Sequence, residues 1–341
     1  MSHRETAPNR HPSMFDVAAL AGVSAQTVSR VSNGAASVRE STRLKVVAAM
    51  RELGYRPNAA ARALKRGSFQ SIGVIATTLA GYGNLHTIEG IVSAASTRGW
   101  SVTLMLTSDR AIGSVSGAYA RLSEASVDAL VLAVDARVLD ENPLEFPPGL
   151  PVVVVDAGMS SRHTVVDNDQ SDGARQATEH LLALGHTRIA HLGGPRASYA
   201  AAARREAFAE ALRSQGLTAA AVIESDWRVE SGHRAAAEIV DSGATAVFAA
   251  NDDLALGLAR ALHERGMRLP HDMSIVGYDN SPAAESSWPQ LTSVDQDFAA
   301  VGRACVDHLL AALDGDDELA TRLIVPTRLV VRSSTAAPRP T

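Results

Sequence analysis

An alternation that begins at Ser71 constrains the fold more than any other feature of the sequence. Short continuous runs of Val, Ile, Leu and Ala alternate with longer amphipathic stretches as far as Tyr278. Apolar runs of this length are typical of strands buried on both faces, and amphipathic stretches are typical of helices that cover a sheet. The alternation therefore predicts an α/β fold with doubly wound parallel sheets.

The expected strands are Ile72–Ala76, Val102–Leu106, Ala129–Val134, Val152–Asp156, Ile189–Leu192, Ala246–Ala250 and Ile275–Tyr278. The expected helices are Leu85–Arg98, Asp172–Leu184, Ala201–Ser214, Glu230–Asp241 and Asp253–Arg265. This region is long enough for two α/β lobes. Ligands of such sheets bind at the carboxyl ends of the strands, so we expect a pocket between the lobes.

The first part of the chain has a helical pattern instead. Ser13 with Asp16 forms a capping-box-like helix start, and Gly22 is placed to end that helix. Ser24 can cap a second helix, and a third is expected over Glu40–Leu53. Three short helices with a tight turn between the first two predict a helix-turn-helix unit.

Charge is distributed unevenly between these two regions. Residues 1–67 carry eleven Arg and Lys against four Asp and Glu, a net of +7, whereas the whole chain carries −5. A basic head on an acidic body is the asymmetry expected when one domain meets phosphate. A solvated basic surface would have the same composition, so charge alone does not decide between them.

Other sequence features exclude several classes of protein. No apolar run is long enough to span a bilayer, and no secretory signal is visible. The single cysteine, Cys305, excludes an intramolecular disulfide and a multi-thiolate metal site. We therefore expect a cytoplasmic protein with no membrane contact, no metal and no cofactor.

The residues themselves resemble a known family. Residues 14–67 (MFDVAALAGVSAQTVSRVSNG…TRLKVVAAMRELGYRPNAAARALKRG) closely resemble the lactose/galactose repressor family, LacI/GalR. The resemblance continues through IGVIATTL (72–79), ALGHTRIAHLGGP (183–195), ANDDLALG (250–257), SIVGYDNSP (274–282) and LTSVDQDF (291–298). It implies an all-α helix-turn-helix head and a two-lobe, periplasmic-binding-protein-like α/β core. It also implies a repressor of sugar-utilisation genes that a small sugar, such as a galactoside or another glycoside, controls allosterically.

Composition, the residue pattern and the resemblance together predict a division of the chain. The expected parts are a disordered arm (1–12), a helix-turn-helix domain (13–57), a hinge helix (58–69), an effector-binding core (70–334) and a tail (335–341). Within the core, the N-lobe is expected at about 70–168 and 298–327, and the C-lobe at about 169–297 and 328–334.

The second helix is expected to read operator DNA. Gln26 and Arg30 can bond base edges in the major groove, Thr27 and Ser29 suit phosphates or bases, and Ala25 suits a thymine methyl group. By resemblance, the set of DNA-binding residues also includes Asn33, Thr42, Tyr55, Asn58, Ala61 and Leu64. Two hinge helices would pair in the minor groove of a dimer, where Leu64 would wedge into the central base step. The alternative for Leu64 is an ordinary packing role.

A sugar pocket needs groups that bond vicinal hydroxyls and an aromatic ring for the apolar face of the pyranose. By resemblance, the expected effector-binding residues are Thr77, Asp156, Arg204, Trp227, Asn251, Asp279 and Gln296. The alternative for each polar residue is a cap or turn role, and for Trp227 a role in packing. In the implied mechanism, effector rotates or closes the lobes, and the hinge helices can then no longer pair.

Several alternatives stay open. A purine or phosphosugar corepressor would use the same fold, whereas a sugar-binding protein or a sugar-modifying enzyme would have no role at DNA. No catalytic motif is visible, so we expect no enzyme; Gly193-Gly194-Pro195 lacks the rest of a dinucleotide-binding fingerprint. His180, His186 and His191 are expected at the surface or in turns, and Asp252 and Asp253 as helix caps.

Two further points concern assembly and the third helix. The sequence has no leucine heptads near its end, which favours a homodimer. Arg39 stands where the family has a hydroxyl cap, and Ser37 can cap from further out.

Overall fold

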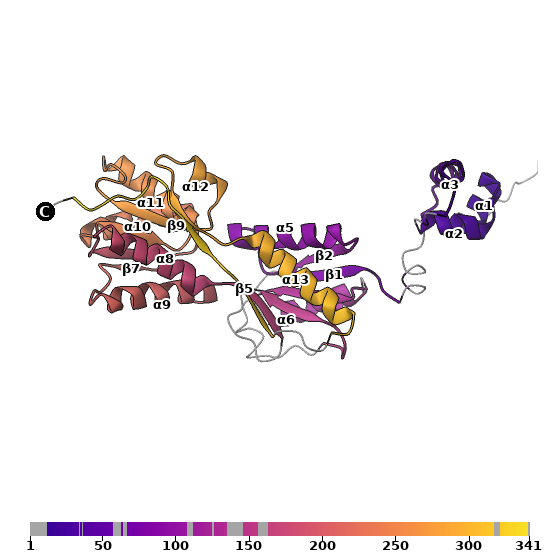
Figure 1. Cartoon of the computed structure of the whole chain (residues 1–341), viewed down its shortest axis with the longest axis horizontal. Helices are drawn as coiled ribbons and strands as arrows, with labels where there is room; N and C mark the ends of the chain where they lie inside the picture. Colours follow the sequence, from indigo (N-terminus) through magenta and orange to yellow (C-terminus); the bar gives the residue numbers. More distant parts are fainter. Residues whose placement is uncertain are drawn as a thin grey trace, which may run out of the picture. The chain divides into compact units, whose positions relative to one another are not determined.

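The computed structural model describes residues 12–33, 35, 37–56, 63, 67–107, 112–124, 126–134, 146–155, 163–316 and 321–339. The chain divides into two compact units, Met1–Phe69 and Gln70–Thr341, which we call the head and the core (Figure 1).

Three helices form the head, and their termini follow from local side chains. They are α1 (Met14–Ala21), α2 (Ala25–Ser32) and α3 (Glu40–Leu53). Ser13 and Asp16 close the capping box at the start of α1, and Gly22 ends it in the left-handed conformation at φ 65°. Ser24 caps α2 as predicted. Val17, Val28 and Val46 are fully buried where the three helices meet. The predicted helix-turn-helix unit is therefore confirmed.

The start of α3 differs from this pattern. Arg39 occupies the N-cap position, and no side chain there accepts a hydrogen bond from the first turn, so the expectation that Ser37 caps α3 is wrong. Arg43 strengthens this end instead: its Nη2 donates to the Ala35 carbonyl at 2.7 Å and its Nε lies 3.5 Å from Glu40 Oε2. The lack of a side-chain cap typically lowers the stability of a helix by about 1 kcal/mol.

The N-lobe of the core is a six-stranded parallel sheet between helices. Its order is β11-β5-β4-β3-β1-β2. The strands are β1 (Ser71–Ala76), β2 (Ser101–Leu106), β3 (Ala129–Ala133), β4 (Val152–Val155), β5 (Thr164–Asn168) and β11 (Arg322–Val325). The helices α5 (Tyr82–Thr97) and α13 (Phe298–Leu313) share one buried cluster with the sheet, and α6 (Ile112–Glu124) shares another. Side chains that alternate along β1, such as Val74 and Ile75, belong to these two different clusters.

The C-lobe has the same strand order, β12-β10-β9-β8-β6-β7. The strands are β6 (Ile189–Leu192), β7 (Val222–Ile223), β8 (Ala246–Ala249), β9 (Ser274–Tyr278), β10 (Thr292–Asp295) and β12 (Arg328–Val330). Helices α8 (Gln170–Ala183) and α9 (Tyr199–Ser214) cover one face; α10 (Val229–Asp241) and α11 (Asp252–Glu264) cover the other, near the short α12 (Pro282–Ser286). All the strands of this sheet run parallel except β12, which is antiparallel to β10.

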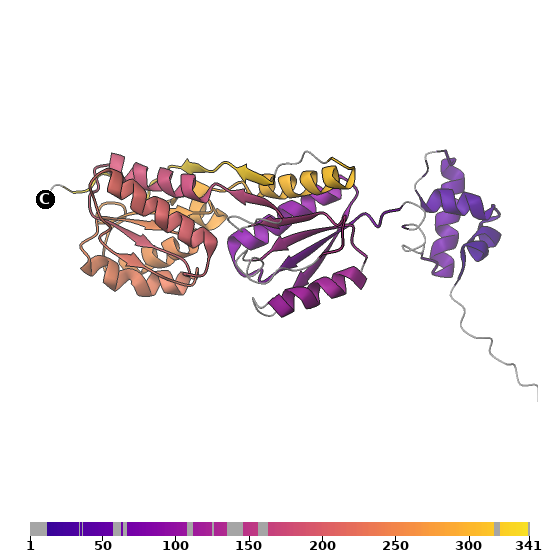
Figure 2. The same ribbon diagram turned by 90° about the horizontal axis from the view of Figure 1, so that it is seen from below.

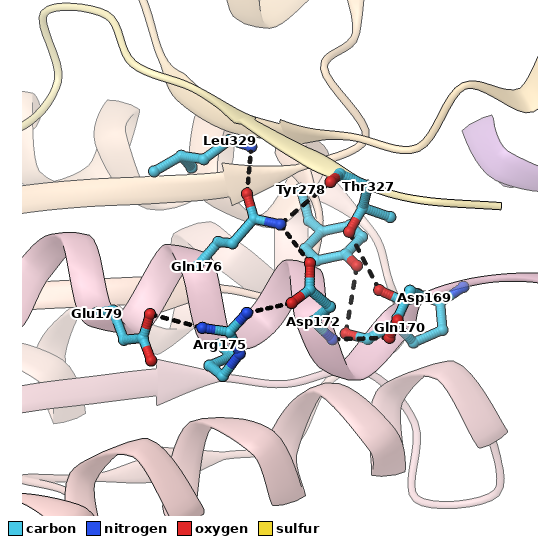
Figure 3. Close-up of polar contacts among 9 residues, drawn as sticks. All are labelled: Asp169, Gln170, Asp172, Arg175, Gln176, Glu179, Tyr278, Thr327 and Leu329. Atoms are coloured by element: carbon cyan, nitrogen blue, oxygen red, sulfur yellow. Dashed lines mark hydrogen bonds and ion pairs between the residues drawn. The ribbon is translucent and has the colours of Figure 1, made fainter. Parts of the chain in front are cut away.

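The chain crosses between the lobes three times, after β5, after β10 and after β11 (Figure 2). Figure 3 shows that α8 ties the first and third crossings together. Thr327 Oγ1 donates to the Asp169 carbonyl at 3.2 Å, and Gln176 Nε2 donates to the Thr327 carbonyl at 3.1 Å. Leu329 N donates to Gln176 Oε1 at 2.9 Å. These bonds thus hold the first and third crossings to each other and to α8 of the C-lobe.

The expected doubly wound fold is confirmed, with corrections to individual elements. The list of expected strands lacks five, Thr164–Asn168, Val222–Ile223, Thr292–Asp295, Arg322–Val325 and Arg328–Val330, and the list of expected core helices lacks three of the described ones, Ile112–Glu124, Pro282–Ser286 and Phe298–Leu313. The missed strands are short or contain polar residues, so they give no continuous apolar run. No helix among the described residues has the length and apolar character needed to cross a membrane.

The predicted tail also has contacts in the structure. Thr335 Oγ1 lies 2.9 Å from His180 Nε2, and the Ala336 carbonyl lies 2.9 Å from His186 Nε2. Arg339 Nη1 lies 2.6 Å from Asp272 Oδ1. His191 lies on β6 and is 0% exposed, so the expectation of a surface or turn position is wrong for this residue. His186 is 2% exposed, and its side chain contacts the tail at Ala336.

Candidate functional site

A cavity of about 540 Å³ lies in the core and is lined by residues of both lobes. The N-lobe contributes Thr77, Tyr82, Asn84, Asn168 and Phe298, among others. The C-lobe contributes Arg204, Trp227, Asn251, Asp279 and Gln296, among others. Six of the seven predicted effector-binding residues therefore line one cavity; the seventh, Asp156, lies outside the described residues.

Strand ends explain why these residues meet. Thr77 follows β1, Asp279 follows β9 and Gln296 follows β10. Parallel strands present their carboxyl ends at the same edge of a sheet, and the cavity lies where the edges of the two lobes face each other.

Arg204 is the centre of a buried polar network. This side chain on α9 is 4% exposed, and its Nε and Nη2 donate to Gln170 Oε1 at 2.9 and 2.7 Å. Its Nη2 also donates to Gln296 Oε1 at 3.2 Å, and its Nη1 donates to the Ala250 carbonyl. The guanidinium carbon lies 3.7 Å from the centroid of the Tyr278 ring, a cation–π contact. The guanidinium is therefore held in a single orientation.

Gln296 links Arg204 to a buried carboxyl group. Its Nε2 donates to Asp279 Oδ1 at 2.5 Å while its Oε1 accepts from Arg204. Burial raises the pKa of Asp279 to about 8, against the opposing charge of Arg204, and the nearby Asp252 carboxylate adds to the rise. The cavity thus presents a guanidinium, an amide and a carboxyl group side by side, a combination that can bond adjacent hydroxyl groups.

Asn251 and the two acidic residues after it have different roles. Asn251 Oδ1 caps α11 by accepting from Leu254 N at 2.9 Å, and its Nδ2 donates to the Trp227 carbonyl at 3.1 Å. Asp252 is not a cap, which corrects that expectation: it is 1% exposed and accepts from Ser281 N at 2.7 Å and Ser293 Oγ at 2.6 Å. Burial raises its pKa to about 6. Asp253 lines the cavity.

Several cavity residues were not predicted. Asp167 and Asn168 end β5, a strand that the sequence pattern did not reveal, and Gln170 begins α8 directly after it. Tyr82 and Phe298 begin α5 and α13, and their rings lie 5.9 Å apart, edge to face. A strand prediction over Thr164–Asn168 would have been the only signal for the first group.

The predicted DNA-reading face of α2 is exposed in the head. Gln26, Arg30 and Asn33 are exposed, and Ala25, Thr27 and Ser29 are partly exposed. Val28 and Val31, on the other side of the helix, are buried. Thr27 Oγ1 lies 2.9 Å from Ser24 Oγ, so it is partly engaged in the cap. Thr42 and Tyr55 are partly buried, whereas Asn58, Ala61 and Leu64 lie outside the described residues.

Two family models match the chain, one for each unit. Residues 13–58 match the model of bacterial regulatory proteins of the lacI family. Residues 178–335 match the model of a periplasmic binding protein-like domain.

The chain is also similar to characterised proteins over most of its length. It is 35% identical over 328 residues to the lactose operon repressor of Escherichia coli (strain K12), covering 95% of this chain and 91% of that protein. It is 34% identical over 341 residues to the transcriptional regulator CelR of Thermobifida fusca, covering 95% of this chain and 98% of that protein. It is 36% identical over 307 residues to the HTH-type transcriptional repressor PurR of Vibrio cholerae, covering 86% of this chain and 89% of that protein. These relatives are transcriptional regulators, not enzymes.

Solved structures give the same result. The Lac repressor dimer bound to operator and the anti-inducer ONPF matches with a TM-score of 0.82 at 33% identity, covering 96% of this chain and 100% of that one. The complex of CelR with cellobiose matches with a TM-score of 0.68 at 32% identity, covering 95% of this chain and 99% of that one. The resemblance seen in the sequence is confirmed: the chain belongs to the lacI family of bacterial regulatory proteins, which are DNA-binding transcriptional repressors controlled by small-molecule effectors.

Proposed function

We propose that this protein is a cytoplasmic, homodimeric repressor of sugar-utilisation genes whose effector is a neutral glycoside. The observation that carries the proposal is the fixed group of Arg204, Gln296 and Asp279 beside Trp227 in one cavity. The polar groups suit adjacent hydroxyls, and the indole suits the apolar face of a sugar ring. The complex of the similar regulator CelR with cellobiose supports a saccharide as the effector.

Charge favours a neutral effector over a phosphosugar. Five acidic residues are among the described residues that line the cavity, against two basic ones. The acidic residues are Asp167, Asp226, Glu230, Asp253 and Asp279, and the basic ones are Arg204 and Arg228. This excess stays even if Asp279 is protonated, and a negative potential repels a phosphate group.

The head supports the DNA-binding half of the proposal. Gln26 and Arg30 are exposed on the face of α2 that is opposite to the buried valines, where a recognition helix contacts base edges. In a dimer, two such heads would read the two halves of a palindromic operator. The Lac repressor, to which the chain is similar, is also bound to its operator as a dimer. The roles of Asn58, Ala61 and Leu64 in the minor groove rest on the sequence resemblance.

In the proposed mechanism, effector bound between the lobes changes their mutual arrangement through the three crossings. This change alters the spacing of the N-lobes in the dimer and so weakens the pairing of the hinge segments. The effector shifts this equilibrium only by the difference between its affinities for the two states.

A binding panel tests the effector class. The full chain is titrated calorimetrically with galactosides, glucosides, disaccharides, sugar phosphates and purine bases. Each ligand that binds is then tested at fixed salt for its effect on the affinity for duplexes selected from a randomised palindromic pool. We expect a neutral glycoside to bind and to weaken DNA binding, and its phosphorylated analogue to bind at least about tenfold more weakly.

One test variant and one matched control variant accompany the panel. Trp227→Leu should weaken glycoside binding, whereas Trp288→Phe should keep it unchanged, because Trp288 is 96% exposed and does not line the cavity. A purine or a sugar phosphate that binds more tightly than any glycoside, or that tightens DNA binding, would overturn the proposed effector class.

A further inference from the structure

Trp227 has a backbone conformation that tryptophan rarely adopts. Its φ is 71°, in the left-handed region. Surrounding contacts must maintain such a conformation. Trp227 is also the predicted stacking residue, so whatever holds it in place decides where the aromatic wall of the cavity lies.

Hydrogen bonds hold the backbone on both sides of Trp227. Ser225 Oγ donates to the Gly193 carbonyl at 2.7 Å, which ties the segment to the turn that follows β6. Asn251 Nδ2 donates to the Trp227 carbonyl at 3.1 Å, which ties it to the start of α11. Asp226 Oδ1 accepts from Arg228 N at 3.2 Å and from Ser231 Oγ. These bonds fix the backbone but not the indole ring.

The ring is placed by its contact with Gly194. A Cβ added to Gly194 would lie 2.3 Å from Cη2 and Cζ2 of Trp227 and 2.5 Å from its Cε2. The indole therefore occupies the space that a side chain at position 194 would need. Gly194 does not have a left-handed backbone, unlike Gly185 nearby. Glycine is thus required at position 194 because the Trp227 ring needs the space, and not because of the backbone conformation.

Any shift of the ring changes the cavity. The guanidinium carbon of Arg204 lies 5.7 Å from the centroid of the indole, and its own position is fixed by Gln170, Gln296 and Ala250. A displaced indole would change its separation from this fixed group, and with it the space in which one face of a ligand ring can lie.

We propose that Gly194 is a specificity-determining position: its missing side chain lets the Trp227 indole lie against the turn after β6, and this placement sets the room for an effector ring beside Arg204. The inference rests on the proposed function in that a ligand stacks on Trp227. The placement of the ring itself can be measured without any ligand.

The test uses the full chain with Trp100→Phe and Trp288→Phe, so that Trp227 is the single fluorophore of the three tryptophans. Gly194→Ala should shift the emission of Trp227 and increase its quenching by acrylamide in the absence of effector. It should also weaken binding of the glycoside identified by the panel at least about tenfold, because sub-3 Å contacts force the ring to move. Affinity for the selected DNA should stay unchanged.

Gly117→Ala is the matched control. Gly117 lies on α6, and an added Cβ there would meet only Arg121 Nη1, at 3.9 Å. This variant should change neither the fluorescence nor the affinity.

A double variant guards against a general loss of folding. Trp227→Leu alone should weaken glycoside binding, and adding Gly194→Ala should weaken it no further, because the ring that clashes is gone. Additive losses, or unchanged Trp227 emission and glycoside affinity in Gly194→Ala, would overturn the inference. If no glycoside binds the parent chain, the proposed function fails, and the emission of Trp227 alone then decides whether Gly194 places the ring.

Discussion

The two lobes of the core share one strand order but bury different chemistry. The N-lobe sheet is packed almost entirely by aliphatic side chains on both faces. The C-lobe buries an arginine, two aspartates and two histidines, of which Arg204 and Asp279 line the cavity. The comparison teaches that one half of a two-lobe site can fix ligand orientation through a linked buried network, while the other lines the site with separate side chains such as Thr77, Asn84 and Tyr82. We therefore expect effector specificity and pH sensitivity to lie in the C-lobe.

The largest expected effect concerns the polar groups on the two sides of the cavity. Arg204→Lys should weaken glycoside binding roughly 100-fold, about 3 kcal/mol, because an ammonium cannot reproduce the forked bonds to Gln170 and Gln296. Thr77→Val in the N-lobe should cost no more than about tenfold, since it removes a single hydroxyl. Calorimetry measures both, with Arg213→Lys on the exposed face of α9 as the control. Equal losses of glycoside affinity in Arg204→Lys and Thr77→Val would contradict the proposed difference between the two lobes.

His191 should make the C-lobe sensitive to acid. It is fully buried, and burial lowers its pKa to about 4. Its Nδ1 bonds to the Phe248 carbonyl at 3.0 Å, and its Nε2 has no partner among the described residues. The unfolded chain, with an ordinary histidine pKa near 6.5, binds more protons between these values, so stability falls as pH drops from about 6.5 to about 4.

We expect His191 to cost up to about 3 kcal/mol of stability across this pH window. Urea unfolding at pH 7 and pH 4 of the parent chain and of His191→Leu measures the difference. The variant is needed as the reference because the raised pKa values of Asp252 and Asp279 act with the opposite sign. A constant difference between the two proteins at both pH values would refute the assignment.

The N-lobe should instead be sensitive to steric change. A Cβ at Gly302 of α13 would lie 2.2 Å from the carbonyl carbon of Gly90 and 2.4 Å from the amide nitrogen of Ile91, both on α5. Gly302→Ala should destabilise the protein by about 1–3 kcal/mol, because backbone atoms cannot rotate away. The urea midpoint measures this, with Gly117→Ala as the control. A neutral Gly302→Ala would show that α5 and α13 separate readily.

The smallest effect lies in the head. Arg39→Ser would supply the missing cap of α3 and should stabilise the head by about 0.5–1 kcal/mol. Thermal unfolding followed by circular dichroism measures the gain, and Arg51→Ser at the other end of α3 should give none. No gain at position 39 would mean that a side-chain acceptor at this helix end adds nothing to the stability of the head.

Sequence reasoning recovered the parts of the molecule whose signals are local. The capping box of Ser13 and Asp16 and the buried strand Ile189–Leu192 follow directly from the residues. The strand Thr164–Asn168 was missed because two valines among polar residues give no apolar run, and Asn168 and Gln170 were missed with it. The role of Gly194 depends on contact between residues 33 positions apart, which no local pattern reveals. The burial of Asp252 and His191 depends in the same way on packing between distant segments.

The shared strand order also has a consequence for synthesis of the chain. Each lobe completes its sheet with one of the last two strands: β11 pairs with β5 and β12 pairs with β10. A ribosome that has made residues up to Asp295 has synthesised all the remaining strands of both sheets, yet each sheet still has an open edge. Such edges are sites of aggregation during folding. Premature termination anywhere before Arg322 would therefore leave the sheets of both lobes incomplete. A truncated chain of this kind would not fold into a core that binds the effector without controlling DNA binding.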